Sequence, residues 1–116
     1  MIEIKRASRE LSKVERYRMT LSPEIQTMQT LEDNVVIEVK AFCIFADVDT
    51  ETGEESELLS ILSTDDVAYV TQSATFMKSF TDIADIFADE PDSVFSIRKI
   101  SGTNKAGRAY VNCVLA

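Results

Sequence analysis

The stretch from residue 73 to residue 92, SATFMKSFTDIADIFADEPD, constrains the fold most, because its apolar residues recur with the period of a helix. Spacings of i, i+4, i+7, i+8 and i+11 place one apolar stripe along an amphipathic helix; the residues are Phe76, Phe80, Ile83, Ala84 and Phe87. Ser73 or Thr75 can cap this helix, and Pro91 ends it. The phenylalanines are therefore expected in the core and not in a base-stacking site.

The other apolar runs have the composition of β-strands. Residues 14–21, VERYRMTL, alternate in polarity up to Pro23, and the run from Val35 to Val48 is rich in β-branched and aromatic residues. A third strand is expected over residues 57–73, interrupted by the turn STDD, and the last two over residues 93–101 and 108–116. In the final strand the core-facing residues are expected to be Ala109, Val111, Cys113 and Leu115.

The run from Val35 to Val48 has two unequal faces. Its odd-numbered positions up to Phe45 are wholly apolar and are predicted to face the core. Its even-numbered positions include Lys40 and Phe42, which predicts a charge and an exposed ring on the outer face. Phe42 is equally compatible with a place in a second core.

Three strands, one helix and two strands follow one another, which is the element order of the OB-fold. The sequence therefore predicts a mainly β fold, a five-stranded OB-fold-like barrel with one helix between strands three and four, in a single domain over residues 1–116. Residues 1–12 have no clear period and indicate either a short helical turn capped by Ser8 or a flexible basic arm.

Several function classes are disfavoured by what the chain lacks. It contains no histidine and no phosphate-binding glycine loop, so we expect no enzyme, no cofactor and no metal site. Cys43 and Cys113 each stand in an apolar run and are expected to be buried free thiols. An apolar signal region and an apolar run long enough to span a membrane are both missing, which predicts a cytosolic protein.

The charge of the chain is unevenly distributed. The net charge is −8, yet residues 1–18 hold six bases and three acids, and residues 98–116 hold four bases and no acid. Seventeen acids stand against two bases in between. Because binding depends on the local field, the two basic ends would form a cationic groove if folding brought them to one side. The alternative is that they are solvated surface charges.

Bases interleaved with aromatic rings suit a groove for single-stranded nucleic acid. In OB-folds the ligand crosses strands two and three, between the first loop and the loop joining strands four and five, which here is SGTNKAGR. The same stretch is compatible with an ordinary hairpin turn. The candidate DNA-binding residues are Arg16, Tyr17, Arg18, Lys40, Phe42, Lys99, Lys105, Arg108 and Tyr110.

The densest acidic stretch, ADVDTETGEESE at residues 46–57, lacks the spacing of a calcium loop and predicts a solvated hairpin tip around Gly53. The acidic middle of the chain also motivates a second hypothesis, an acidic protein-binding module that mimics DNA or inhibits a nucleic-acid enzyme.

Three segments resemble the small single-stranded DNA-binding proteins of tailed phages that infect Gram-positive bacteria, and the similarity runs from about residue 8 to the end. They are SRELSKVERYRMTLSPEIQTMQTL, VVIEVKAFCIFADV and ISGTNKAGRAYVNCVLA. The resemblance implies an OB-fold and sequence-independent binding that protects unwound DNA during phage replication or recombination in the host cytoplasm. It implies single-stranded DNA as a partner, and replication or recombination proteins as further partners. The strong acidity of residues 47–66 departs from the family pattern.

Overall fold

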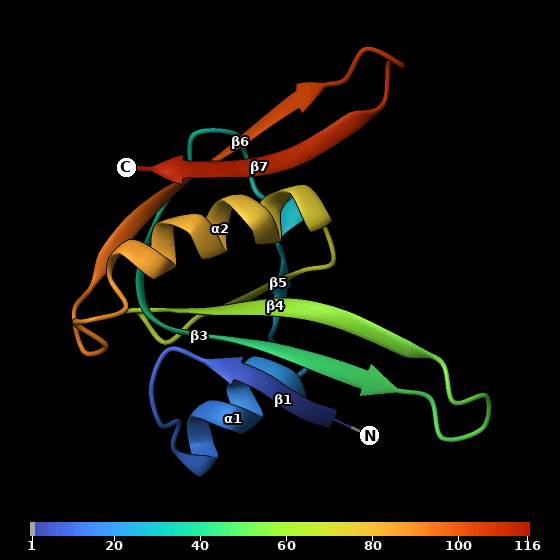
Figure 1. Ribbon diagram of the computed structural model, residues 1–116, viewed down its shortest axis with the longest axis vertical. Coiled ribbons are helices and arrows are strands. Elements are labelled where there is room, and N and C mark those ends of the chain that lie inside the picture. The colour runs from blue at the N-terminus through green and yellow to red at the C-terminus, as the bar shows by residue number, and fades with distance from the viewer. Residues whose placement is uncertain (1) are drawn as a thin grey trace.

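The computed structural model describes residues 2–116 as a mainly β fold, in which one curled sheet forms a half-barrel accompanied by two helices (Figure 1). The elements in chain order are β1 (Ile2–Ala7), α1 (Lys13–Thr20), β2 (Gln26–Thr27), a 3-10 turn (Met28–Thr30), β3 (Val36–Val48), β4 (Glu55–Ser63), β5 (Ala68–Thr71), α2 (Ala74–Ile86), β6 (Phe95–Thr103) and β7 (Ala109–Leu115).

Strand β3 organises the sheet, whose order is β2-β5-β4-β3-β6-β7. Along one edge β3 pairs antiparallel with β4, from Val39 to Val48. Along its other edge it changes partner, because Val36–Val39 pair with β6 whereas residues 43–47 pair with β1. The register with β4 shifts between Val39 and Ala41, so Lys40 occupies an irregularity at the point where the partner changes.

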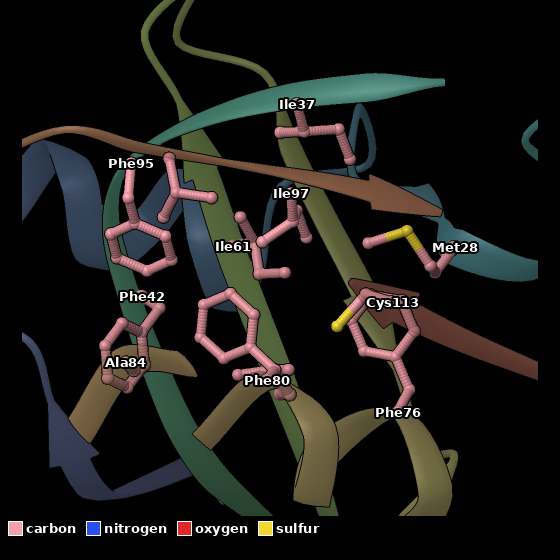
Figure 2. Packing of buried hydrophobic residues seen from close by; sticks show 12 residues of the cluster. Met28, Ile37, Phe42, Ile61, Phe76, Phe80, Ala84, Phe95, Ile97 and Cys113 are labelled. Atoms are coloured by element: carbon pink, nitrogen blue, oxygen red, sulfur yellow. The ribbon is translucent and has the colours of Figure 1, made fainter. Parts of the chain in front are cut away.

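This irregularity turns β3 between two cores. Before it, Ile37 and Val39 face the core under α2, and after it the even-numbered Phe42 joins that core (Figure 2). The odd-numbered residues beyond Lys40, among them Cys43 and Phe45, face a second core, which includes Leu11 and Met19. Residues 41–46 of β3 are thus covered on both faces, whereas Asp47 beyond them is exposed.

Helix α2 has the predicted position and apolar stripe. The Ser73 hydroxyl accepts a hydrogen bond from the backbone N–H of Phe76 at 3.2 Å, which caps the helix as predicted. Phe80 is fully buried and meets Phe42 edge to face, with ring centroids 5.0 Å apart. The helix ends at Ile86, five residues before Pro91, so the proline follows a short turn and does not itself stop the helix.

The predicted strand over residues 14–21 is wrong, since Lys13–Thr20 form α1. Ser12 and Glu15 make a capping box, in which the hydroxyl accepts from the Glu15 N–H and the carboxylate accepts from the Ser12 N–H. Only Met19 of this helix is buried, so its apolar side is too narrow to produce a helical period in the sequence.

Neither hypothesis for residues 1–12 describes β1, which is a strand paired with β3; Met1 lies outside the described residues. The expected third strand is two strands, because the chain reverses after Ser63 through Asp66, whose φ is 62°. The described residues therefore hold seven strands and two helices, where five and one were predicted. The order from β3 to β7, with α2 before β6, is still three strands, one helix and two strands.

Two hairpins extend beyond the body of the molecule, toward the right of Figure 1. One joins β3 to β4, and the other joins β6 to β7 as predicted. In β7 only part of the predicted core face is covered, since Cys113 is buried and Val111 half-buried, while Ala109 and Leu115 are exposed. Within residues 2–116, no helix has the length and apolar character needed to cross a membrane.

Candidate nucleic-acid interface

The tip of the β6–β7 hairpin is a compact turn that presents two cations. Asn104 organises it, because its side-chain oxygen accepts from the backbone N–H groups of Ala106 and Arg108, each at 3.0 Å. Gly107 has a φ of +80°, which suits glycine, and donates its N–H to the Asn104 carbonyl at 2.9 Å. The Lys105 and Arg108 side chains are exposed.

The register of the hairpin sorts its side chains onto two faces. Lys99 lies opposite Cys113 on the face toward α2 and the core. On the other face, which we call the outer face, Arg98 lies opposite Val114 and Gly102 opposite Tyr110. Arg98 and Val114 are exposed, and Tyr110 retains 38% of its surface.

Ion pairing separates the cations of the protein into two groups. Seven of them lie within 4 Å of a carboxylate: Lys5, Arg6, Arg9, Arg18, Lys40, Lys78 and Lys99. Within residues 2–116 the other five, which we call the unpaired cations, have no such partner: Lys13, Arg16, Arg98, Lys105 and Arg108. Two unpaired cations are on α1, and three are on the β6–β7 hairpin.

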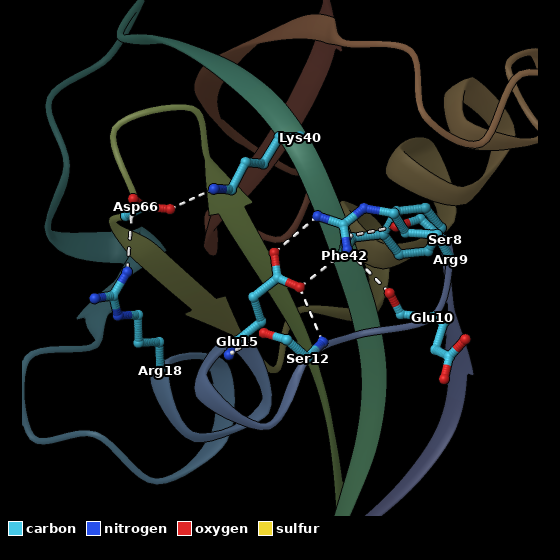
Figure 3. Close-up of polar contacts among 9 residues, drawn as sticks. All are labelled: Ser8, Arg9, Glu10, Ser12, Glu15, Arg18, Lys40, Phe42 and Asp66. Carbon is cyan, nitrogen blue, oxygen red and sulfur yellow. Dashed lines mark hydrogen bonds and ion pairs between the residues drawn. The ribbon is translucent and has the colours of Figure 1, made fainter.

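The candidate residues at α1 include an ion-pair cluster (Figure 3). Arg18 and Lys40 both contact the carboxylate of Asp66, and the pKa of Asp66 is lowered chiefly by the hydrogen bond from Lys40. Lys40 and Arg18 are therefore partly neutralised, whereas Arg16 and Tyr17 on the same helix are exposed.

A second ion pair fastens the start of α1. Arg9 holds Glu15 through two hydrogen bonds of 2.8 and 3.0 Å. These bonds, and then the N–H of Ser12, lower the pKa of Glu15 to about 2. Arg9 thus stabilises the start of α1.

A comparison with protein families identifies the family of this chain. Residues 6–116 match the family model described as "Phage Single-stranded DNA-binding protein". The chain belongs to this family. Comparisons with curated proteins and with solved structures gave no match.

The match extends over all but the first five residues of the chain. The family is one of DNA-binding proteins, and single-stranded DNA is the partner that membership gives to the chain. No group of three or more potential metal ligands occurs in the part of the chain that the structure describes.

Two candidate residues of this DNA-binding protein are buried. Of the two alternatives for Phe42, the place in a core is confirmed and the exposed ring is wrong, because the register irregularity at Lys40 turns the ring into the core, where it is 4% exposed. The guanidinium of Arg6 lies 5.5 Å from the centre of this ring and is held by Asp85 at 2.6 Å. Phe42 borders a cavity of about 200 Å³ but offers no free face to DNA.

Lys99 is the second buried candidate, with 3% of its side chain exposed. Its ammonium donates to the Leu31 carbonyl and lies 3.5 Å from the Asp33 carboxylate. Its backbone N–H and carbonyl also bind the segment around Asn34. Lys99 therefore fixes the segment before β3 onto β6, and its ammonium is turned away from solvent.

The remaining candidates do not converge on one groove. The hairpin tip with Lys105 and Arg108 lies at the top of Figure 1, and α1 with Arg16 and Tyr17 lies at the bottom. Two unpaired cations, Lys13 and Arg98, were missed by the sequence analysis. The alternation of β6, which places Arg98 on the same face as Gly102, is the signal that could have identified Arg98.

Proposed function

We propose that the protein binds single-stranded DNA without sequence preference, mainly through the β6–β7 hairpin, and so protects unwound DNA during phage replication or recombination. The observation that supports this is the composition of the hairpin. It combines three unpaired cations with an exposed tyrosine, and residues 98–116 contain no acid.

The chemistry of the hairpin suits the backbone and the ring faces of DNA. Lys105, Arg108 and Arg98 can neutralise phosphates, and such contacts carry no sequence information. Tyr110 offers a ring on which any base can stack. Because every nucleotide has a phosphate and a π-face, this set of side chains favours sequence-independent binding.

We further infer that the unit from β3 to β7 is a variant of the OB-fold, preceded by β1, α1 and β2. Counted from β3, the β6–β7 turn is the loop between the fourth and fifth strands, one of the two loops with which OB-folds bind oligonucleotides. Arg16 and Tyr17, with the neighbouring Lys13, form a second exposed basic and aromatic patch on α1 that longer DNA can reach.

A double substitution, Lys105→Ala with Arg108→Ala, tests the proposal. Fluorescence anisotropy with labelled oligo-dT at several salt concentrations measures Kd and its salt dependence. Each phosphate contact contributes about 0.7 to the slope of log K against log salt, so losing two contacts reduces the slope by about 1.4. Lys78→Ala is the matched control, since Lys78 is an exposed cation on α2 paired with Asp82.

Unchanged affinity and slope in the double variant would exclude the hairpin as the main DNA contact. The acidic-module hypothesis is tested by the same titration, because it expects no affinity for the oligonucleotide at low salt and a protein partner that dissociates at high salt.

A further inference from the structure

Gly102 and Tyr110 form a cross-strand pair on the outer face of the hairpin, and the tyrosine fills the space that a side chain at Gly102 would need. A Cβ built on Gly102 would lie 2.5 Å from the Tyr110 hydroxyl oxygen and 2.6 Å from the ring carbon that carries it. The Tyr110 side chain therefore leans across onto β6, with its hydroxyl end directly over the glycine.

The backbone at this position does not require glycine. The positive φ values among the glycines belong to Gly53 and Gly107, and Gly102 lies in an ordinary strand. Glycine inside a strand is unfavourable compared with alanine, because it loses more backbone freedom and contributes no side-chain packing. What Gly102 provides is room for the ring.

We infer that Gly102 and Tyr110 together form a nucleobase-stacking subsite, and this inference rests on the proposed function. The missing side chain at Gly102 leaves room for the ring to lie across β6 and present its free face to a base. Tyr110 keeps 38% of its surface although its hydroxyl end lies against β6, so part of the ring is open to a ligand. The ligand class is a nucleobase of single-stranded DNA, recognised by its π-face.

The cations around the pair fit this ligand. Arg98 lies on the same outer face, four residues before Gly102, which corresponds to about 13 Å along a strand. Arg108 precedes Tyr110 by two residues, and Lys105 lies in the same turn. A base stacked on Tyr110 thus has unpaired cations on both sides of it, where the adjoining phosphates of the strand can bind.

A purely structural role for the pair makes a different prediction. An aromatic ring that only covers a strand glycine would stabilise the hairpin, and losing it would lower the unfolding free energy without a preference for the chemistry of the DNA. The two roles are separated by comparing oligo-dT with an oligonucleotide of the same length made of abasic sites, which keeps the phosphates and lacks the bases.

The experiment measures Kd for both oligonucleotides with the wild type, Gly102→Ala, Tyr110→Leu and the double variant, and thermal unfolding for each protein. Stacking contributes about 1–3 kcal/mol per base, so each single variant is expected to bind oligo-dT roughly five- to 150-fold more weakly. Affinity for the abasic oligonucleotide should change less than twofold. The double variant should be no weaker than the weaker single variant, because both changes remove one contact.

Wild-type affinity of Gly102→Ala for oligo-dT would overturn the inference, as would an equal loss on both oligonucleotides. Tyr110→Leu keeps the glycine and covers it with an apolar side chain, so it decides the question if Gly102→Ala does not fold. Failure of the proposed function gives a different result, in which the Lys105→Ala, Arg108→Ala protein binds both oligonucleotides as the wild type does.

Discussion

The two hairpins that extend from this protein have nearly the same turn and opposite charge. In the β3–β4 tip, Asp49 accepts from the N–H groups of Glu51 and Thr52 at 2.8 and 3.2 Å, and Gly53 takes a φ of +75°. In the β6–β7 tip, Asn104 and Gly107 have the corresponding roles. Each tip is closed by an acceptor side chain at its start and a glycine in the left-handed region near its end.

The charges on the two tips differ completely. Residues 47–57 of the β3–β4 hairpin hold six acids and no base, whereas residues 98–116 hold four bases and no acid. Even the turn acceptor follows this pattern, since a carboxylate serves in the acidic tip and a neutral amide in the basic one. The comparison teaches that turn geometry alone does not distinguish the proposed DNA-binding hairpin from the acidic one, and that its unpaired cations do.

The largest expected effect comes from reversing the charge of the basic tip. Lys105→Glu with Arg108→Glu should weaken oligo-dT binding at least about 100-fold, because two charge-assisted contacts contribute about 3 kcal/mol or more. The matched control is Glu51→Lys with Glu54→Lys on the acidic tip. If the control weakens binding as much as the reversal does, the assignment of the two hairpins is wrong.

Lys99 is a buried cation on the same hairpin, and its removal should affect the stability of the fold and not DNA binding. Lys99→Met removes the ammonium that binds the Leu31 carbonyl and faces Asp33, so we expect a loss of about 1–3 kcal/mol in the unfolding free energy. DNA affinity at a temperature where the protein is folded should stay within about twofold. Denaturant unfolding measures the loss of stability, and oligo-dT titration measures the DNA affinity. A large loss of affinity without a loss of stability would contradict this prediction.

Acid should destabilise the fold at the start of α1. The pKa of Glu15 is lowered to about 2 from an ordinary value of 4.5, so the stability that it contributes is present above pH 4.5 and is lost as the pH falls toward 2. Glu15→Gln should lower the unfolding free energy by about 1–2 kcal/mol at pH 7 and flatten this part of the pH profile. A variant with the wild-type profile between pH 5 and pH 2 would disprove this assignment.

The smallest effect is expected when the side chain that accepts the turn hydrogen bonds, Asn104 or Asp49, is exchanged for the other type. Asn104→Asp preserves the acceptor and adds one negative charge at the basic tip, which should weaken DNA binding about two- to fivefold, as for one exposed charge worth up to about 1 kcal/mol. Asp49→Asn is the matched change in the acidic tip and should leave affinity unchanged. Thermal unfolding of both variants confirms that the turns are intact. Equal effects of the two substitutions on Kd would contradict the proposed difference between the β3–β4 and β6–β7 hairpins.

The sequence predicts the strongly periodic parts of this fold well, and for identifiable reasons. The α2 stripe, the Ser73 cap and the last hairpin are correct because apolar period and turn chemistry agree there. Both cysteines are buried free thiols as predicted, and burial raises their pKa to about 12. Helix α1 was missed because five of its eight residues are charged or aromatic and only Met19 is buried.

The candidate site was harder to predict, since it depends on contacts between distant segments. Phe42 is buried because one register irregularity at Lys40 reverses the faces of β3, which no local pattern indicates. Lys99 is buried because the carbonyl of Leu31, 68 residues away, receives its ammonium. Lys105 and Arg108 were identified from local charge alone, and both are left unpaired within the described residues.

The most direct test of the proposed DNA-binding hairpin is a titration of the 13.0 kDa protein with oligo-dT, in which NMR monitors the backbone amide chemical shifts. The proposed function predicts that the largest shifts arise at Arg98, Lys105, Arg108 and Tyr110, with smaller ones on α1. Largest shifts in residues 47–57, with the β6–β7 hairpin unperturbed, would contradict it.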